Sequence, residues 1–327
     1  MKKKLLIGFA FILAVVLLAF VIQKAGGIVA VATELGSAFS RHPLFVVVGI
    51  LFFSTSLFCG ITRWYILLRK LNLPLRYRDC IRLYAIGHFC NMLGPGALGG
   101  DVVKASWVAK TNPTKRTELI TSIAAERFIG MVAMVFFVAT ICACSPDFFA
   151  AHTQLIPFRN MFFIIFLGVL IFLILLVVVN WGKYAHKLKV REGGIREKLL
   201  EIFVRSWETL RVCLTHPWTT GSAFLISLLN HCVDVICYFI LSRSLELTVR
   251  FRELLVVSPI ANTVAAIPIT PGGAGVRENI LQEMLYYVGV SHDESAALGL
   301  LMFSTLLIWA IVGAIVGFFM RSNKKRR

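Results

Sequence analysis

The sequence predicts an all-α polytopic membrane protein, and three observations support that fold class. Of the 327 residues, 58% are hydrophobic. Long apolar runs recur along the chain, and they match the roughly 20 residues that a helix needs to cross about 30 Å of hydrocarbon. Lys and Arg outnumber Asp and Glu by 34 to 17 and gather between these runs. A β-barrel is excluded, because its strands would alternate apolar and polar residues.

About six full spans are expected, together with two interrupted hydrophobic segments. The first span follows the sequence MKKK, and its apolar core is longer than that of a signal peptide, so we interpret it as a retained helix. If each interrupted segment instead forms two tilted spans, the total becomes eight. The six predicted full spans are residues 5–22, 44–68, 119–143, 161–180, 221–241 and 297–320.

The positions of the basic residues predict the orientation. Cytoplasmic loops of membrane proteins are enriched in Lys and Arg, which places both termini in the cytoplasm. The net charge of +17 follows from this bias. Nucleic acid is not an expected partner, since no compact basic domain with interleaved aromatic residues is present. The basic residues in predicted outer segments are Lys24, Arg41, Arg159, Arg243, Arg250 and Arg252.

Two Pro-Gly stretches interrupt the apolar sequence, NMLGPGALGGDVVKA at 91–105 and NTVAAIPITPGGAGVRE at 262–278. Proline lacks the N–H that a helix interior needs, and clustered glycines lower helix stability. The apolar runs beside each break are too short to span. We therefore expect two re-entrant hairpins, residues 80–109 opening inward and residues 254–288 opening outward. Broken helices in two such halves are typical of transporters with inverted-topology repeats.

The chain is expected to form one transmembrane domain over residues 1–327, built from two halves, 1–143 and 221–320. Between them, residues 183–213 carry apolar and charged residues at helical spacing. This pattern predicts an amphipathic helix at the cytoplasmic face of the membrane.

The two breaks predict a binding site. Backbone groups released at membrane depth must face protein or a watery cavity, and a helix that begins there favours an anion such as phosphate. The alternative is that Gly and Pro only allow close helix packing. The candidate substrate-binding residues are Asn91, Gly96, Gly99, Gly100, Asp101, Lys104, Glu126, Arg127, Asn262, Pro271, Gly272, Gly273, Gly275, Arg277 and Glu278.

Ionisable residues inside the membrane are functional candidates because burying them is costly. We expect Arg127 to pair with Asp101, and Glu126 to pair with Lys104 or Arg277; a purely structural ion-pair network is the alternative. Asp234 fits a site or a packing role equally. No catalytic residue, metal site or cofactor is predicted, and GPGALGGD lacks the Gly-Lys-Ser/Thr ending of a phosphate-binding P-loop.

Three segments resemble signatures of the lysylphosphatidylglycerol synthase transmembrane-region family, also called the flippase-like domain family. They are LGPGALGGDVVKA, AAERFIGM and IPITPGGAGVRE, and the resemblance covers essentially the whole chain. It implies a multi-pass protein of a bacterial-type cytoplasmic (inner) membrane, with a lipid-handling cavity. Members fused to an aminoacyl-transferase domain make aminoacylated phosphatidylglycerol and move it between leaflets. The chain ends just after its last predicted span, so we expect translocation without lipid aminoacylation. Lys104 stands where the family more often has Arg.

The leading functional hypothesis is a flippase-like transporter that moves an anionic lipid or lipid-linked substrate between leaflets. Transport would be passive or coupled to an ion gradient, since no nucleotide motif is present. A membrane-embedded lipid-modifying enzyme, with Asp101 and Glu126 as acid and base, is one alternative. An accessory subunit of an envelope-biosynthesis system is another. A membrane lipid is the expected partner, and a homo-oligomer or a separate biosynthetic enzyme is possible.

Overall fold

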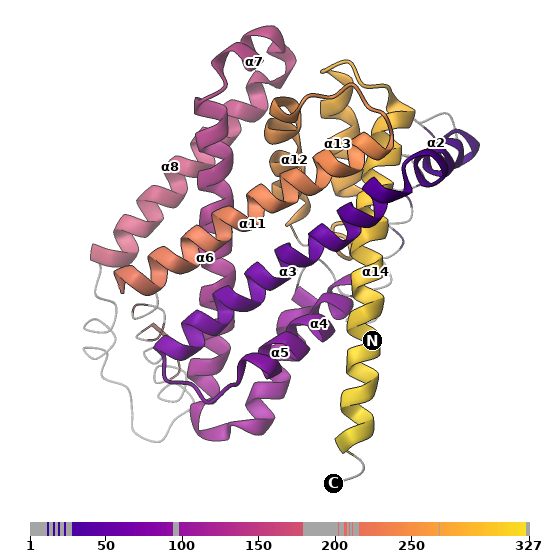
Figure 1. Ribbon diagram of the computed structural model, residues 1–327. Helices are drawn as coiled ribbons and strands as arrows, with labels where there is room; N and C mark the ends of the chain where they lie inside the picture. Colours follow the sequence, from indigo (N-terminus) through magenta and orange to yellow (C-terminus); the bar gives the residue numbers. More distant parts are fainter. Residues whose placement is uncertain are drawn as a thin grey trace.

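The computed structural model describes residues 28–93, 98–178, 216–267 and 269–324, together with positions 12, 16, 19, 23, 202, 206, 207, 209 and 211. The chain in these ranges folds into helices joined by turns (Figure 1). Most of the predicted first span, 5–22, and of the predicted amphipathic segment, 183–213, lies outside the described residues. The helices are α2 (Ile28–Arg41), α3 (Pro43–Lys70), α4 (Tyr77–Leu93), α5 (Leu98–Thr111), η1 (Pro113–Lys115), α6 (Arg116–Ala143), α7 (Pro146–Ala151), η2 (Thr153–Leu155), α8 (Ile156–Val178), α11 (Pro217–Ser244), α12 (Phe251–Ala265), α13 (Val276–Tyr286) and α14 (His292–Lys324).

Five helices in the described ranges are long and apolar enough to cross a membrane, and they match five of the six predicted spans. They comprise α3, α6, α11, the segment Thr153–Leu175 that includes most of α8, and the segment His292–Phe319 of α14. The predicted outer loop between the third and fourth spans is partly helical. Pro146 begins α7 there, since proline fits the first turn of a helix, where its missing N–H is not needed.

The two interrupted segments each form a pair of short helices, α4 with α5 and α12 with α13, and the members of each pair contact one another. These helices have 17, 14, 15 and 11 residues. At 1.5 Å per residue the longest is about 26 Å, below the roughly 30 Å of the hydrocarbon core. None of the four is among the described helices that are long and apolar enough to span.

The same order of helices occurs twice, with two long helices enclosing a short pair. In the first half α3 and α6 enclose the α4–α5 pair, and in the second half α11 and α14 enclose the α12–α13 pair. The helices α3 and α11 pack side by side and antiparallel (Figure 1). Gly49 permits this packing, because a Cβ there would lie 2.5 Å from the side chain of Leu241. The short pairs therefore approach the middle from opposite ends of the molecule.

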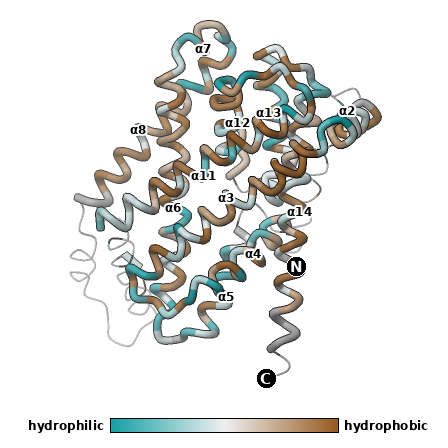
Figure 2. The backbone as a smooth tube through the Cα atoms, viewed as in Figure 1, coloured by the Kyte–Doolittle hydropathy of each residue, from teal (hydrophilic) through white to brown (hydrophobic). Residues whose placement is uncertain are grey.

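Hydrophobic residues make up much of the long helices, as the brown stretches of α3, α8 and α14 in Figure 2 show. The apolar stretch of α8 is only 6% buried inside the protein, and Ile164, Leu167 and Phe172 are more than half exposed. Such a helix is stable where its surroundings are hydrocarbon. The fold is that of a multi-pass membrane protein.

Candidate functional site

The tips of the two short-helix pairs meet near the middle of the molecule. Gly272, Gly273 and Gly275 have φ angles of 59°, 74° and 79°, a left-handed conformation that favours glycine because it has no Cβ. A Cβ on Gly272 would collide with the side chain of Met92, which lies at the end of α4. Predicted site residue Gly96 lies outside the described residues, as do the other residues from 94 to 97.

Glycines at the first tip allow α4 and α5 to pack closely. A Cβ on Gly100 would lie 2.6 Å from the carbonyl oxygen of Gly87, and one on Gly99 would collide with the carbonyl of Cys90. The Asn91 side chain accepts a hydrogen bond of 2.6 Å from the backbone N–H of Gly100. Close packing thus accounts for Gly99 and Gly100, whereas Asn91 satisfies a free N–H in the first turn of α5.

Charged residues around the first pair form a buried network that we call the ion cluster: Arg63, Asp101, Lys104, Glu126 and Arg127. Glu126 is fully buried. Its Oε1 accepts hydrogen bonds from both Nε, at 3.0 Å, and Nη2 of Arg63. The Tyr84 hydroxyl donates to the same oxygen at 3.1 Å. Three donor atoms of Arg63 and Tyr84 thus converge on one oxygen of this buried carboxylate, and removing one partner of such a buried ion pair is strongly destabilising.

The other half of the ion cluster centres on Asp101. Arg127 Nε donates to Asp101 Oδ2 at 2.7 Å, and Lys104 Nζ lies 3.2 Å from Oδ1. Lys104 also lies 3.7 Å from Glu126 and 4.4 Å from the ring centre of Tyr84. The expected pairings of Arg127 with Asp101 and of Glu126 with Lys104 are both present. Three cations face two carboxylates, which leaves one net positive charge.

Arg63 is a member of the ion cluster that the sequence pattern did not identify as a site residue. It lies in the middle of an apolar run, ITRWYILL, within the predicted span 44–68. An arginine inside a span is itself a signal, because it is costly there unless it is paired. Arg63 Nη1 also donates to Ser227 of α11 at 2.9 Å, so it ties the first half to the second.

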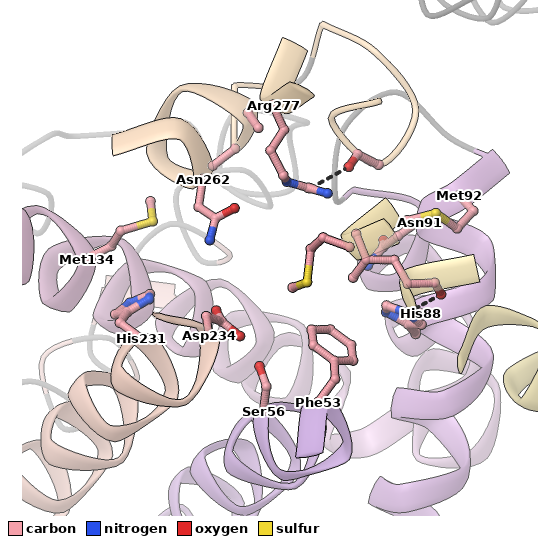
Figure 3. A pocket seen from close by; sticks show the side chains of 15 residues that line it. Phe53, Ser56, His88, Asn91, Met92, Met134, His231, Asp234, Asn262 and Arg277 are labelled. Carbon is pink, nitrogen blue, oxygen red and sulfur yellow. Dashed lines mark hydrogen bonds between the residues drawn. The ribbon is translucent and has the colours of Figure 1, made fainter. Parts of the chain in front are cut away.

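A cavity of about 240 Å³ lies between the two tips and is walled by α3, α4, α6, α11, α12, α13 and α14 (Figure 3). We call it the central cavity. Four predicted site residues, Asn91, Asn262, Gly272 and Arg277, line it. Asp234, which the sequence left undecided, lines it too, as do His88 and His231. The polar side chains on its wall are Ser56, His88, Asn91, His231, Asp234, Asn262 and Arg277.

Arg277 projects into the central cavity, as Figure 3 shows. Its Nη2 donates to the carbonyl of Gly272 at 2.9 Å. Its Nη1 is buried without a hydrogen-bond partner among the described residues and lies 3.8 Å from a carboxylate oxygen of Glu278. Asp234 Oδ1 and His231 Nε2 likewise have no such partner. Buried donors and acceptors are normally satisfied, so these three atoms set the residues of this wall apart from the rest of the interior.

The remaining predicted residues of the second tip shape it and do not line the central cavity. Glu278 is fully buried, and its Oε2 accepts the backbone N–H of Gly275 at 2.7 Å, which caps the start of α13. Pro271 is buried in the turn. Gly273 allows close packing, because a Cβ there would lie 2.8 Å from the carbonyl oxygen of Ala265.

Comparison with known proteins agrees with this architecture. Residues 5–317 match the family model described as the lysylphosphatidylglycerol synthase TM region. The chain is also 25% identical over 303 residues to a UPF0104 membrane protein of Pyrococcus horikoshii, an alignment that covers 86% of this chain and 88% of that protein. Because the family model covers nearly the whole chain, the protein belongs to the lysylphosphatidylglycerol synthase transmembrane-region family.

Proposed function

We propose that the protein moves a phospholipid with an anionic headgroup from one leaflet to the other through the central cavity. The observation that carries this proposal is the position of Arg277, whose side chain lines the central cavity and whose buried Nη1 has no hydrogen-bond partner among the described residues. An arginine binds phosphate oxygens with its planar fork of donors. Asn91 and Asn262 on the same wall would donate further hydrogen bonds to the headgroup.

The repeated order of helices supports an alternating mechanism. We interpret the two short pairs as re-entrant hairpins, because their helices are shorter than the membrane is thick and their tips meet inside the protein. Because α3 and α11 are antiparallel (Figure 1), the two halves are related by inversion. Rocking of one half against the other would open the central cavity to each leaflet in turn.

Basic residues at one end of the molecule support the orientation with both termini in the cytoplasm. Arg69 and Lys70 end α3, Lys110 lies near the end of α5, and Arg116 begins α6. The opposite end carries acidic residues as well, among them Glu246 and Glu294. Positive loops remain on the cytoplasmic side. In this orientation the α4–α5 hairpin opens inward and the α12–α13 hairpin outward.

The test is translocation of fluorescent phosphatidylglycerol in liposomes that contain the purified protein, with dithionite quenching to report the outer leaflet. The protein should accelerate exchange. Arg277→Gln should slow it by about tenfold or more, since a hydrogen bond to a charged group contributes roughly 1.5–3 kcal/mol. The matched control is Arg252→Gln, which removes an exposed cation on α12 outside the central cavity and should leave the rate unchanged.

Failure to accelerate exchange of several lipids, with and without a pH gradient, would overturn the proposal. In that case the hypothesis of a membrane-embedded lipid-modifying enzyme would be tested next, by incubating the protein with lipid donors and analysing the products by mass spectrometry.

A further inference from the structure

A second, almost wholly apolar pocket of about 140 Å³ lies between α3, α4 and α14. We call it the lateral pocket. Its apolar wall includes Leu57, Phe58, Ile81, Val312 and Val316. Phe58 is 50% exposed and Val312 39% exposed, so the pocket opens on the outer surface of the protein. In a membrane that surface faces hydrocarbon.

Close helix contacts surround the lateral pocket. Trp309 Nε1 donates to the carbonyl of Ile50 at 2.8 Å and ties α14 to α3. Gly313 lets α14 approach α4, because a Cβ there would collide with the backbone of Ala85. Gly60 lets Tyr84 of α4 lie against α3 in the same way. Three helices held together at these points keep a space between them that their own side chains do not fill.

The lateral pocket shares a wall with the polar sites. His88 lines the lateral pocket, the central cavity and a third cavity of about 30 Å³ beside Lys104 and Arg127. His88 Nε2 is hydrogen-bonded at 3.1 Å to the carbonyl of Leu306, another central-cavity residue. His88 therefore borders both the apolar lateral pocket and the central cavity that Arg277 lines.

We propose that the lateral pocket holds part of one acyl chain of the phospholipid whose headgroup occupies the central cavity. The inference rests on the proposed function and deepens it, since it assigns a place to the apolar end of the substrate. The volume suits a segment of one chain, because pockets that hold a whole drug-sized molecule are about 300 Å³ or larger. The headgroup then lies inside the protein while the chain remains at the hydrocarbon surface.

The energetics make the two sites depend on one another. A chain that leaves the bilayer for an apolar pocket gains little, because lipid tails are as apolar as the side chains that replace them. Retention must therefore come from the headgroup and Arg277. An acyl chain should occupy the lateral pocket only when the central cavity can bind its headgroup.

The experiment uses the purified full chain in detergent and phosphatidylglycerol with a photoreactive diazirine in the middle of one chain. Crosslinked peptides are mapped by mass spectrometry and should come from the walls of the lateral pocket. Val312→Phe should reduce this labelling by about tenfold, because it overfills the pocket. Ile311→Phe is the matched control, because Ile311 is next to Val312 and is 59% exposed but does not line the pocket. Arg277→Gln should also reduce the labelling.

A second pair of variants covers the case in which Val312→Phe does not fold. Val316→Phe fills the same pocket one helical turn away, and Ile315→Phe, at a 51% exposed position outside it, is its control. Labelling spread over lipid-facing helices such as α8, or equal labelling in variant and control, would overturn the inference. Labelling of the pocket without translocation in liposomes would instead overturn the proposed function alone. Translocation without labelling of the pocket would overturn only the proposal that the lateral pocket holds an acyl chain.

Discussion

The two hairpins share a sequence pattern but differ in how their charges are used. In the first, Lys104 is 2% exposed and lies between Asp101 and Glu126. In the second, Arg277 faces the central cavity with one nitrogen unbonded among the described residues. The difference comes from the long helix beside each hairpin. The helix α6 supplies the Glu126-Arg127 pair, whereas α14 supplies Gly299, which packs against Glu278. The cation of the first hairpin lies among buried carboxylates, whereas the cation of the second lines a cavity.

The largest effect is expected from breaking the ion cluster. Glu126→Ala would leave Arg63 and Lys104 buried beside an empty space, and removal of one partner of a buried ion pair costs about 3–5 kcal/mol. The variant should therefore lower the unfolding temperature in detergent strongly or reduce the yield of folded protein. Glu246→Ala, at an exposed ion pair, is the control and should change little. A Glu126→Ala protein as stable as the parent would show that the ion cluster does not hold the hairpin.

The next effect compares the two motif cations directly. Lys104→Met removes a charge that lies between two carboxylates, and Arg277→Met removes one that lies beside Glu278 on the cavity wall and that we propose binds the headgroup. We expect Lys104→Met to have the larger loss of thermal stability, and Arg277→Met to have the larger loss of translocation per folded molecule, about tenfold or more. Thermal unfolding measures the loss of stability, and the liposome assay on the same preparations measures the loss of translocation. The reverse order would mean that the first hairpin binds the substrate.

Glycine substitutions distinguish packing at the two tips. Gly100→Ala would place a Cβ 2.6 Å from the backbone oxygen of Gly87, and an overpacked contact of this kind costs about 1–3 kcal/mol. Gly272→Ala meets the flexible end of Met92 and a positive φ, at a cost of roughly 1–2 kcal/mol. Gly168→Ala on α8 meets nothing within 4 Å and should be neutral or slightly stabilising. The unfolding temperature should fall most for Gly100→Ala, less for Gly272→Ala and least for Gly168→Ala. Equal unfolding temperatures of the three variants would refute close packing at the first tip.

Much of the architecture could be predicted because hydrophobic length and helix-breaking residues are local signals. Five predicted spans and both short pairs are present, with ends shifted by a few residues, as at Tyr77 where residue 80 was expected. The partners of buried charges are not local. Arg63 and Glu126 are far apart in sequence and meet only through packing of α3 on α6. The same limit applies to Asp234 and His88, whose place on the cavity wall depends on all seven helices around it.

Glycine and charge within the motifs show a similar limit. The sequence marks Gly99, Gly100 and Gly273 as special, but both a ligand site and close packing require a residue without a Cβ. In the structure a Cβ at any of the three would meet a backbone carbonyl, so close packing is present at all three, and their role in binding a ligand stays a prediction. Likewise, Glu278 was grouped with Arg277 by position alone, although one carboxylate caps a helix and the neighbouring guanidinium faces a cavity.

The smallest effect is expected at the exposed pair between the two halves. His42 hydrogen-bonds to Glu246 at 2.8 Å, and Arg41 lies 3.2 Å from the same carboxylate. The hydrogen bond from His42, with the charge of Arg41, lowers the pKa of Glu246 below its ordinary value of 4.5. The folded protein favours the charged carboxylate. The contribution of this pair to the free energy of unfolding is therefore fully present above pH 4.5 and is lost as the pH falls through the pKa of Glu246 in the folded protein. Glu246→Gln should therefore lower the unfolding temperature slightly at pH 7, since exposed pairs contribute little, and its difference from the parent should shrink as the pH falls below 4.5. A difference that does not change with pH would assign the effect to packing and not to charge.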